Sequence, residues 1–128
     1  MNHPDRPAPH IALVDDDADV RVGLHALLRS YGYRVTVYDG AQALLAAGVE
    51  GIDCVVSDVN MPGMDGFELL DHLRASAASP PCILMTALPD NHKLRARALR
   101  SGAACFLGKP VDAEALAACI AATGATPA

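Results

Sequence analysis

Polar side chains that could do chemistry follow several apolar runs of this sequence. Asp15 and Asp16 follow the first run, Asp58 ends a longer one, Thr86 ends a later one, and Lys109 follows the last. Three carboxylates in one place raise one another's pKa unless a cation intervenes, and Mg²⁺ with oxygen ligands fits that need. Asp can also accept a phosphoryl group covalently, a reaction in which the protein mainly positions groups and neutralises charge. A metal, a lysine and a hydroxyl around Asp58 therefore indicate an acyl-phosphate site.

Strands and helices must alternate to bring these side chains together. Apolar or β-branched runs predict strands at 11–14, 34–38, 52–58, 82–86 and 103–107. Helical spacing of apolar residues predicts helices at 19–31, 39–47, from 65 past 73, 90–100 and 111–122. The pattern predicts an α/β fold, a doubly wound parallel sheet with helices on both faces. The carboxyl ends of its strands form one edge, where open α/β sheets bind ligands.

Helix starts and domain limits follow from short local patterns. Asp39 with Gln42, and Asp65 with Glu68, resemble capping boxes, and Asp90 is interpreted as the cap of the fourth helix. The proline-rich residues 1–10 predict a flexible N-terminal lead, 11–123 a single domain, and 124–128 a C-terminal tail.

Composition excludes several classes of function. The 128 residues are 52% hydrophobic, contain no Trp and carry a formal net charge of −5. That charge argues against attraction to nucleic acid or anionic membranes, and no apolar run reaches the roughly 20 residues that span a bilayer. We therefore expect a cytoplasmic domain. The cysteines lack metal-ligand spacing and are expected to be small, buried hydrophobic residues: Cys54, Cys82, Cys105 and Cys119.

Four segments together resemble the receiver domain of bacterial response regulators. They are Val14–Asp16, Asp58–Gly66, Met85–Ala87 and Gly102–Pro110, in the family's order and spacing, and the resemblance runs from about residue 11 to 122. The amino-acid sequence of these segments is most similar to that of receivers in LuxR-type, FixJ-like regulators. The resemblance implies a flavodoxin-like, five-stranded sheet of order 2-1-3-4-5 with five helices.

The resemblance also implies roles around the acceptor. Asp58 would accept a phosphoryl group from a histidine kinase. Asp16, Asp58 and the backbone carbonyl of Asn60 would bind Mg²⁺ directly, and Asp15 would act mostly through water. The domain would be a phosphoacceptor in a two-component or phosphorelay system that regulates transcription, and not an enzyme that turns over free substrates.

A second set of implied roles concerns the switch. Lys109 would pair with Asp58 and then with the phosphoryl oxygens, and Lys109-Pro110 would be a cis peptide. Thr86 would hydrogen-bond the phosphoryl group. Phe106, where many members have Tyr, would follow Thr86 inward. The fourth helix, fifth strand and fifth helix would then bind a downstream protein or a second copy of the chain.

Two alternative functions and one question about a basic surface stay open at this point. A pseudo-receiver would use the same fold for binding without phosphorylation, but it is expected to lack one of the site residues. A phosphatase of the haloacid dehalogenase kind needs a second Asp two residues after the nucleophile, where this chain has Asn60. The basic stripe Lys93, Arg97 and Arg100 on the fourth helix, with Arg95 to one side, is either a solvated face or a contact surface.

Overall fold

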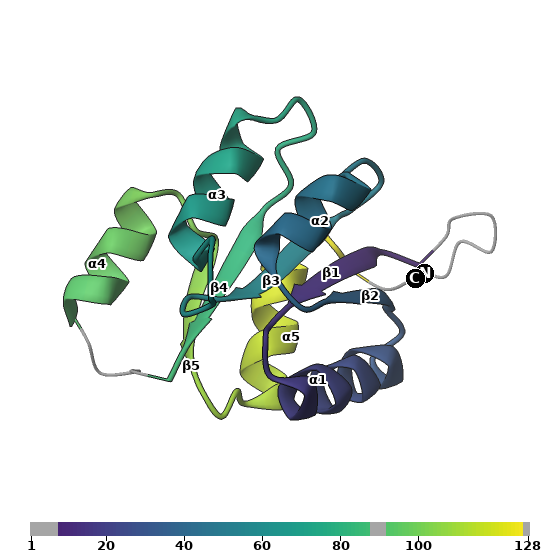
Figure 1. Ribbon diagram of the computed structural model, residues 1–128. Coiled ribbons are helices and arrows are strands. Elements are labelled where there is room, and N and C mark those ends of the chain that lie inside the picture. Colours follow the sequence, from purple (N-terminus) through teal and green to yellow (C-terminus); the bar gives the residue numbers. More distant parts are fainter. Residues whose placement is uncertain (1–7, 88–91, 127–128) are drawn as a thin grey trace.

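The chain folds into one sheet covered by helices on both faces (Figure 1). The computed structural model describes residues 8–87 and 92–126. Strands and helices alternate in the order β1 His10–Val14, α1 Ala18–Ser30, β2 Arg34–Tyr38, α2 Ala41–Ala47, β3 Cys54–Asp58, α3 Gly66–Ala75, β4 Cys82–Thr86, α4 His92–Arg100, β5 Cys105–Gly108 and α5 Ala113–Ala122. All strand pairs are parallel and the sheet order is β2-β1-β3-β4-β5. The predicted flavodoxin-like fold is confirmed.

Alternate residues of the strands supply two separate apolar cores. Ala12, Val14 and Val55 pack with residues of α2, α3 and α4 on one face. Ile11 and Val56 pack with α1 and α5 on the other. Because successive strand side chains point to opposite faces, a strand covered on both sides is buried at every position, as β3 and β4 are, and polar side chains occur only at their carboxyl ends.

One predicted helix cap is confirmed by the structure and another is wrong. Asp65 and Glu68 form the predicted capping box, with Glu68 N–H donating to Asp65 Oδ1 over 2.9 Å. The cap predicted at Asp39 is wrong. Gly40 is extended and is itself the N-cap, so α2 begins one residue later and no side chain caps it. Asp90, the predicted cap of α4, lies outside the described residues.

Both ends of the described chain are fastened beside the start of β2. Arg34 N–H donates to the carbonyl of Pro9 over 3.0 Å, and Tyr33 Oη donates to the carbonyl of Ala125 over 3.0 Å. His10 already belongs to β1, and Ala125 is buried. The limits 11–123 stay a prediction, and the described structure packs slightly beyond them at each end.

The four cysteines are free; Cys54 and Cys82 are buried as predicted, whereas Cys105 and Cys119 are only half-buried. In the described part of the chain, no helix has the length and apolar character needed to cross a membrane.

Candidate functional site

The side chains singled out by the sequence meet at the carboxyl edge of the sheet. Asp15 follows β1, Asp58 is the last residue of β3, and Lys109 follows β5. Lys109 Nζ lies 2.7 Å from Asp15 Oδ2 and 3.3 Å from Asp58 Oδ2. Asp15, Asp16 and Asp58 each offer a carboxylate oxygen within 4.8 Å of the others. The sheet thus brings all three acids and the lysine into one cluster.

Asp15 is the most fully engaged of the three acids. Its side chain is fully buried, Oδ1 accepts a 2.9 Å hydrogen bond from Asp17 N–H, and Oδ2 is paired with Lys109. Its carbonyl accepts a 2.7 Å bond from Arg21 Nη1. Asp17 is itself the N-cap of α1, accepting from Asp19 and Val20 N–H. The helix after β1 is therefore fastened to the acid cluster through its first turn.

The charges around Asp58 act in opposite directions on its carboxyl group. Burial raises the pKa of Asp58, the positive charge of Lys109 lowers it, and neighbouring Asp15 raises it, with a net rise. Burial would lower the pKa of Lys109, but its bond to Asp15 and the negative charges of Asp15 and Asp58 leave that pKa raised. The ammonium group therefore stays charged beside the carboxylates, where it can neutralise an incoming anion.

Backbone contacts fix the positions of these groups. Lys109 N–H donates to the carbonyl of Thr86 over 2.7 Å, and Lys109-Pro110 is cis, as predicted. After β3 the chain turns back so closely that Gly66 N–H donates to the carbonyl of Val59 over 2.9 Å. A Cβ at Gly66 would lie 2.5 Å from the carbonyl oxygen of Asp58. Only glycine fits this close approach without a shift of the loop.

The two residues assigned to the switch are both buried, one at the end of β4 and the other in the neighbouring strand β5. Thr86 ends β4 and is fully buried. Phe106 in β5 is 5% exposed, and the Arg95 guanidinium lies 5.5 Å from the centroid of its ring. Asn60, whose carbonyl was assigned to the metal, is exposed in the loop after β3. Every predicted site residue is thus on the same edge of the sheet or on the adjoining β5.

Four features of the site were missed from sequence. Asp17 is the N-cap of α1, and its position just before the helical pattern is typical of a cap, but no role was predicted for it. Nothing in the sequence indicated that Arg21 bonds Asp15, or that the shorter ion pair of Lys109 is with Asp15. The off-stripe position of Arg95 was the one signal that it faces β5.

The donor set fits a hard divalent cation. Carboxylate oxygens are the ligands that Mg²⁺ prefers, and it needs few of them because it retains water. Asp16 is exposed, whereas both oxygens of Asp15 already have partners. Asp16 and Asp58 are therefore better placed than Asp15 to bind the ion directly.

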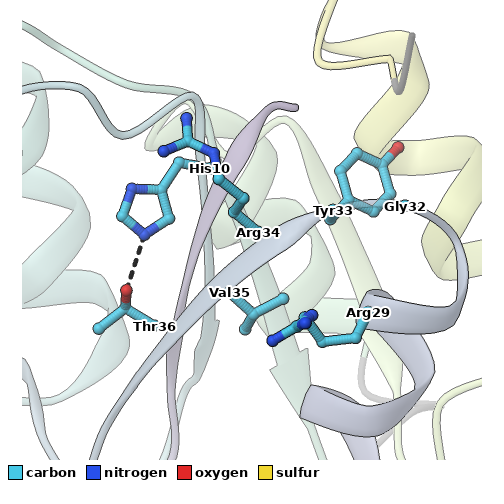
Figure 2. A pocket seen from close by; sticks show the side chains of 7 residues that line it. All are labelled: His10, Arg29, Gly32, Tyr33, Arg34, Val35 and Thr36. Atoms are coloured by element: carbon cyan, nitrogen blue, oxygen red, sulfur yellow. Dashed lines mark hydrogen bonds between the residues drawn. The ribbon is translucent and has the colours of Figure 1, made fainter. Parts of the chain in front are cut away.

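A separate cavity of about 560 Å³ lies at the amino end of β2 (Figure 2). Its lining includes His10, Arg29 and Arg34, and His10 Nε2 is hydrogen-bonded to Thr36 Oγ1 over 2.7 Å. It shares no residue with the carboxylate cluster.

Strand order and an acidic cluster at the carboxyl edge define an open, doubly wound α/β domain with a polar site at the carboxyl ends of its strands. The chain belongs to the response regulator receiver domain family of two-component systems, whose profile matches residues 11–121.

The relatives agree with this assignment. The transcriptional regulatory protein FixJ of Bradyrhizobium diazoefficiens is 45% identical over 113 residues, which cover 87% of this chain and 54% of FixJ. The chain thus spans about half the length of the curated relative it matches. A solved FixJ-N structure is 28% identical with a TM-score of 0.82, covering 92% of this chain and 94% of FixJ-N. The chemotaxis protein CheY4 of Vibrio cholerae is 26% identical with a TM-score of 0.82, covering 91% and 98%.

Proposed function

We propose that this receiver domain accepts a phosphoryl group on Asp58 from a histidine kinase and passes the change to α4, β5 and α5. The observation that carries the proposal is the pairing of one ammonium group with two carboxylates. Lys109 lies 2.7 Å from Asp15 and 3.3 Å from Asp58, within a cluster of three acids. This arrangement leaves Asp58 at the edge of the sheet and beside a fixed positive charge.

The transfer is a displacement at phosphorus. A carboxylate oxygen of Asp58 forms the new P–O bond as the P–N bond to the kinase histidine breaks, and the imidazole leaves with that electron pair and takes a proton from water. Lys109 neutralises the charge of the phosphoryl oxygens, which is the main task of a protein in such transfers. Asp16 and Asp58, with the carbonyl of Asn60, would hold Mg²⁺. The ion would supply charge neutralisation at the phosphoryl oxygens.

The phosphorylated state would be transmitted by Thr86 and Phe106. A phosphoryl group adds negative charge at Asp58, which gives the Thr86 hydroxyl a charged acceptor. A ligand shifts a two-state equilibrium only through its different contacts with the two states, and this hydrogen bond is the difference proposed here. Phe106 would then repack in the space beside Thr86. A downstream protein or a second copy would bind the face formed by α4, β5 and α5, and the output would be control of transcription in the cytoplasm.

Two alternatives are less well supported by the site. A pseudo-receiver needs none of the cluster, yet the acids, Lys109 and Thr86 are all present. An Asp-nucleophile phosphatase needs a proton donor at the position of Asn60, and an amide cannot supply a proton.

Acetyl phosphate with Mg²⁺ separates the three functions. We expect one phosphoryl group per chain by intact mass, and none on the Asp58→Asn variant. Absence of any adduct on the wild type would favour the pseudo-receiver. Continuous release of phosphate at a rate that exceeds adduct hydrolysis would favour the phosphatase.

A further inference from the structure

Helix α4 has little apolar packing to hold it on the domain. Ala98 is its only fully buried residue within the described chain, and Leu94 is half-buried. Leu99 is 59% exposed. Helix α3, by contrast, buries five residues. Because burial of apolar surface is the main force that fixes a helix, the position of α4 must depend strongly on its other contacts.

Two exposed arginines of α4 are among those contacts, and each lies over the ring of a buried phenylalanine. Arg95 lies over Phe106 of β5, 5.5 Å from the ring centroid, and its Nη1 is 3.5 Å from the carbonyl oxygen of Phe106. Arg97 lies over Phe67 of α3, 4.0 Å from the centroid. A guanidinium over the face of an aromatic ring is attracted by the ring's negative face. Residues two apart on a helix point to different sides, so α4 is held on one side by β5 and on the other by α3.

The two rings have different relations to the phosphoacceptor site. Phe67 is a buried core residue that follows Gly66, whose backbone is packed against Asp58 and Val59, so its backbone is tied to the loop after the acceptor strand. Phe106 is the residue proposed to repack when Thr86 moves. Helix α4 therefore contacts one ring whose backbone is tied to the acceptor loop and one ring that is proposed to move.

We propose that Arg95 is the positioning residue that couples Phe106 to α4, while Arg97 anchors α4 on Phe67. The inference rests on the proposed function and names the contact through which the switch reaches α4. Phe106 has no side-chain hydroxyl with which to bond another element. Its ring face and its backbone carbonyl are what it can offer, and Arg95 contacts both. When the ring of Phe106 moves, its contact with the Arg95 guanidinium is lost or re-formed. Helix α4 then shifts, while Arg97 keeps it in contact with Phe67.

The experiment compares three single variants by the amide shifts of α4 after addition of beryllofluoride and Mg²⁺. Beryllofluoride is a mimic of the phosphoryl group, and its binding is measured separately from the bound ¹⁹F signals. Arg95→Gln should bind it as the wild type does, while the α4 response falls to less than half. Arg95→Lys keeps the cation and should restore part of the response. Arg100→Gln, which removes an exposed charge from the same helix, should respond like the wild type.

Arg97→Gln gives the second arm. It should shift the α4 amides before any beryllofluoride is added, because it releases the anchor. A full α4 response in Arg95→Gln with the adduct formed would overturn the proposal and leave the proposed function intact. If the wild type binds no beryllofluoride, both fall together. An Arg100→Gln response as weak as that of Arg95→Gln would show a general charge effect and also overturn the assignment to Arg95.

Discussion

Lys109 forms its shorter ion pair with Asp15, at 2.7 Å between Nζ and Oδ2. Its distance to the proposed acceptor Asp58 is 3.3 Å. The fully buried Asp15 thus holds the lysine in place, and the acceptor is left with the looser of the two contacts. The longer contact suits a residue that must form a new bond, because Asp58 then loses little of its interaction with the Lys109 ammonium group when it reacts.

Removal of the lysine charge should destabilise the fold through Asp15. In Lys109→Gln, Asp15 stays buried without a counter-charge, and we expect the free energy of unfolding to fall by about 1–3 kcal/mol. Urea denaturation measures the change, with Lys93→Gln on the exposed face of α4 as control. The double variant Lys109→Gln with Asp15→Asn should recover part of the loss. Equal stability of Lys109→Gln and the control would contradict the role of the pair.

Mg²⁺ should bind the acid cluster without phosphate. A titration followed by NMR should move amides near Asp15, Asp16 and Asp58. Asp16→Asn removes a direct ligand and should weaken this response strongly, whereas Asp71→Asn, an exposed acid on α3, should not. An undiminished response in Asp16→Asn would place the metal elsewhere.

The close approach at Gly66 should make this position intolerant of a methyl group. A Cβ there would lie 2.5 Å from the carbonyl oxygen of Asp58 and 2.9 Å from Val59 Cα, so the loop must shift. We expect Gly66→Ala to lose about 1–3 kcal/mol of stability and to slow phosphorylation by acetyl phosphate. Gly23→Ala is the matched control, because a Cβ at this helical glycine meets nothing within 4 Å. It should gain roughly 0.5–1 kcal/mol. Equal behaviour of the two variants would refute the packing argument.

His10 should make stability fall in mild acid. Burial and the positive charge of Arg34 lower the pKa of His10 from 6.5. The folded state therefore favours the neutral ring, and the unfolded chain binds more protons as the pH drops below 6.5. The stabilisation is complete above that value and is lost as the pH falls toward the lower pKa of the folded state. His10→Gln keeps a polar group beside Thr36 but cannot titrate. The wild type should lose more stability than His10→Gln between about pH 7 and about pH 5, and parallel curves would exclude His10 as the cause.

Thr86 should be needed for the response of α4 but not for phosphorylation of Asp58. Thr86→Ala lacks the proposed hydrogen bond to the phosphoryl group, yet keeps the backbone carbonyl that accepts from Lys109 N–H. We expect it to gain one phosphoryl group with acetyl phosphate while the amides of α4 respond far less than in the wild type. Thr36→Ala, on the distant strand β2, serves as control. Equal α4 shifts in Thr86→Ala and the wild type would mean that another residue transmits the change.

The sequence was informative where one local pattern decides the outcome. Continuous apolar runs such as Val55 and Val56 identify strands buried on both faces, and the acid after such a run must lie at the carboxyl edge. The prediction failed at Asp39 because the conformation of Gly40, not the capping pattern, decides where α2 begins. It was incomplete at Lys109, since the choice between two carboxylates depends on the difference between side-chain distances of 2.7 and 3.3 Å. No sequence pattern encodes those distances.

Arg95 is a second residue whose contacts could not be predicted from the sequence pattern. Helical spacing separated it from the basic stripe, but spacing alone does not say which ring lies beneath a side chain. That depends on how α4 is rotated against β5, which is a property of the packed structure.

The bonds from Arg34 to Pro9 and from Tyr33 to Ala125 bring both ends of the described chain to the same side of the molecule. The carboxylates occupy the opposite edge of the sheet. A protein engineer could therefore graft the domain into a surface loop of a host protein through two short connectors. The graft would leave the acid cluster pointing away from the host and open to a phosphodonor, so that such a chimera could serve as a phosphorylation reporter.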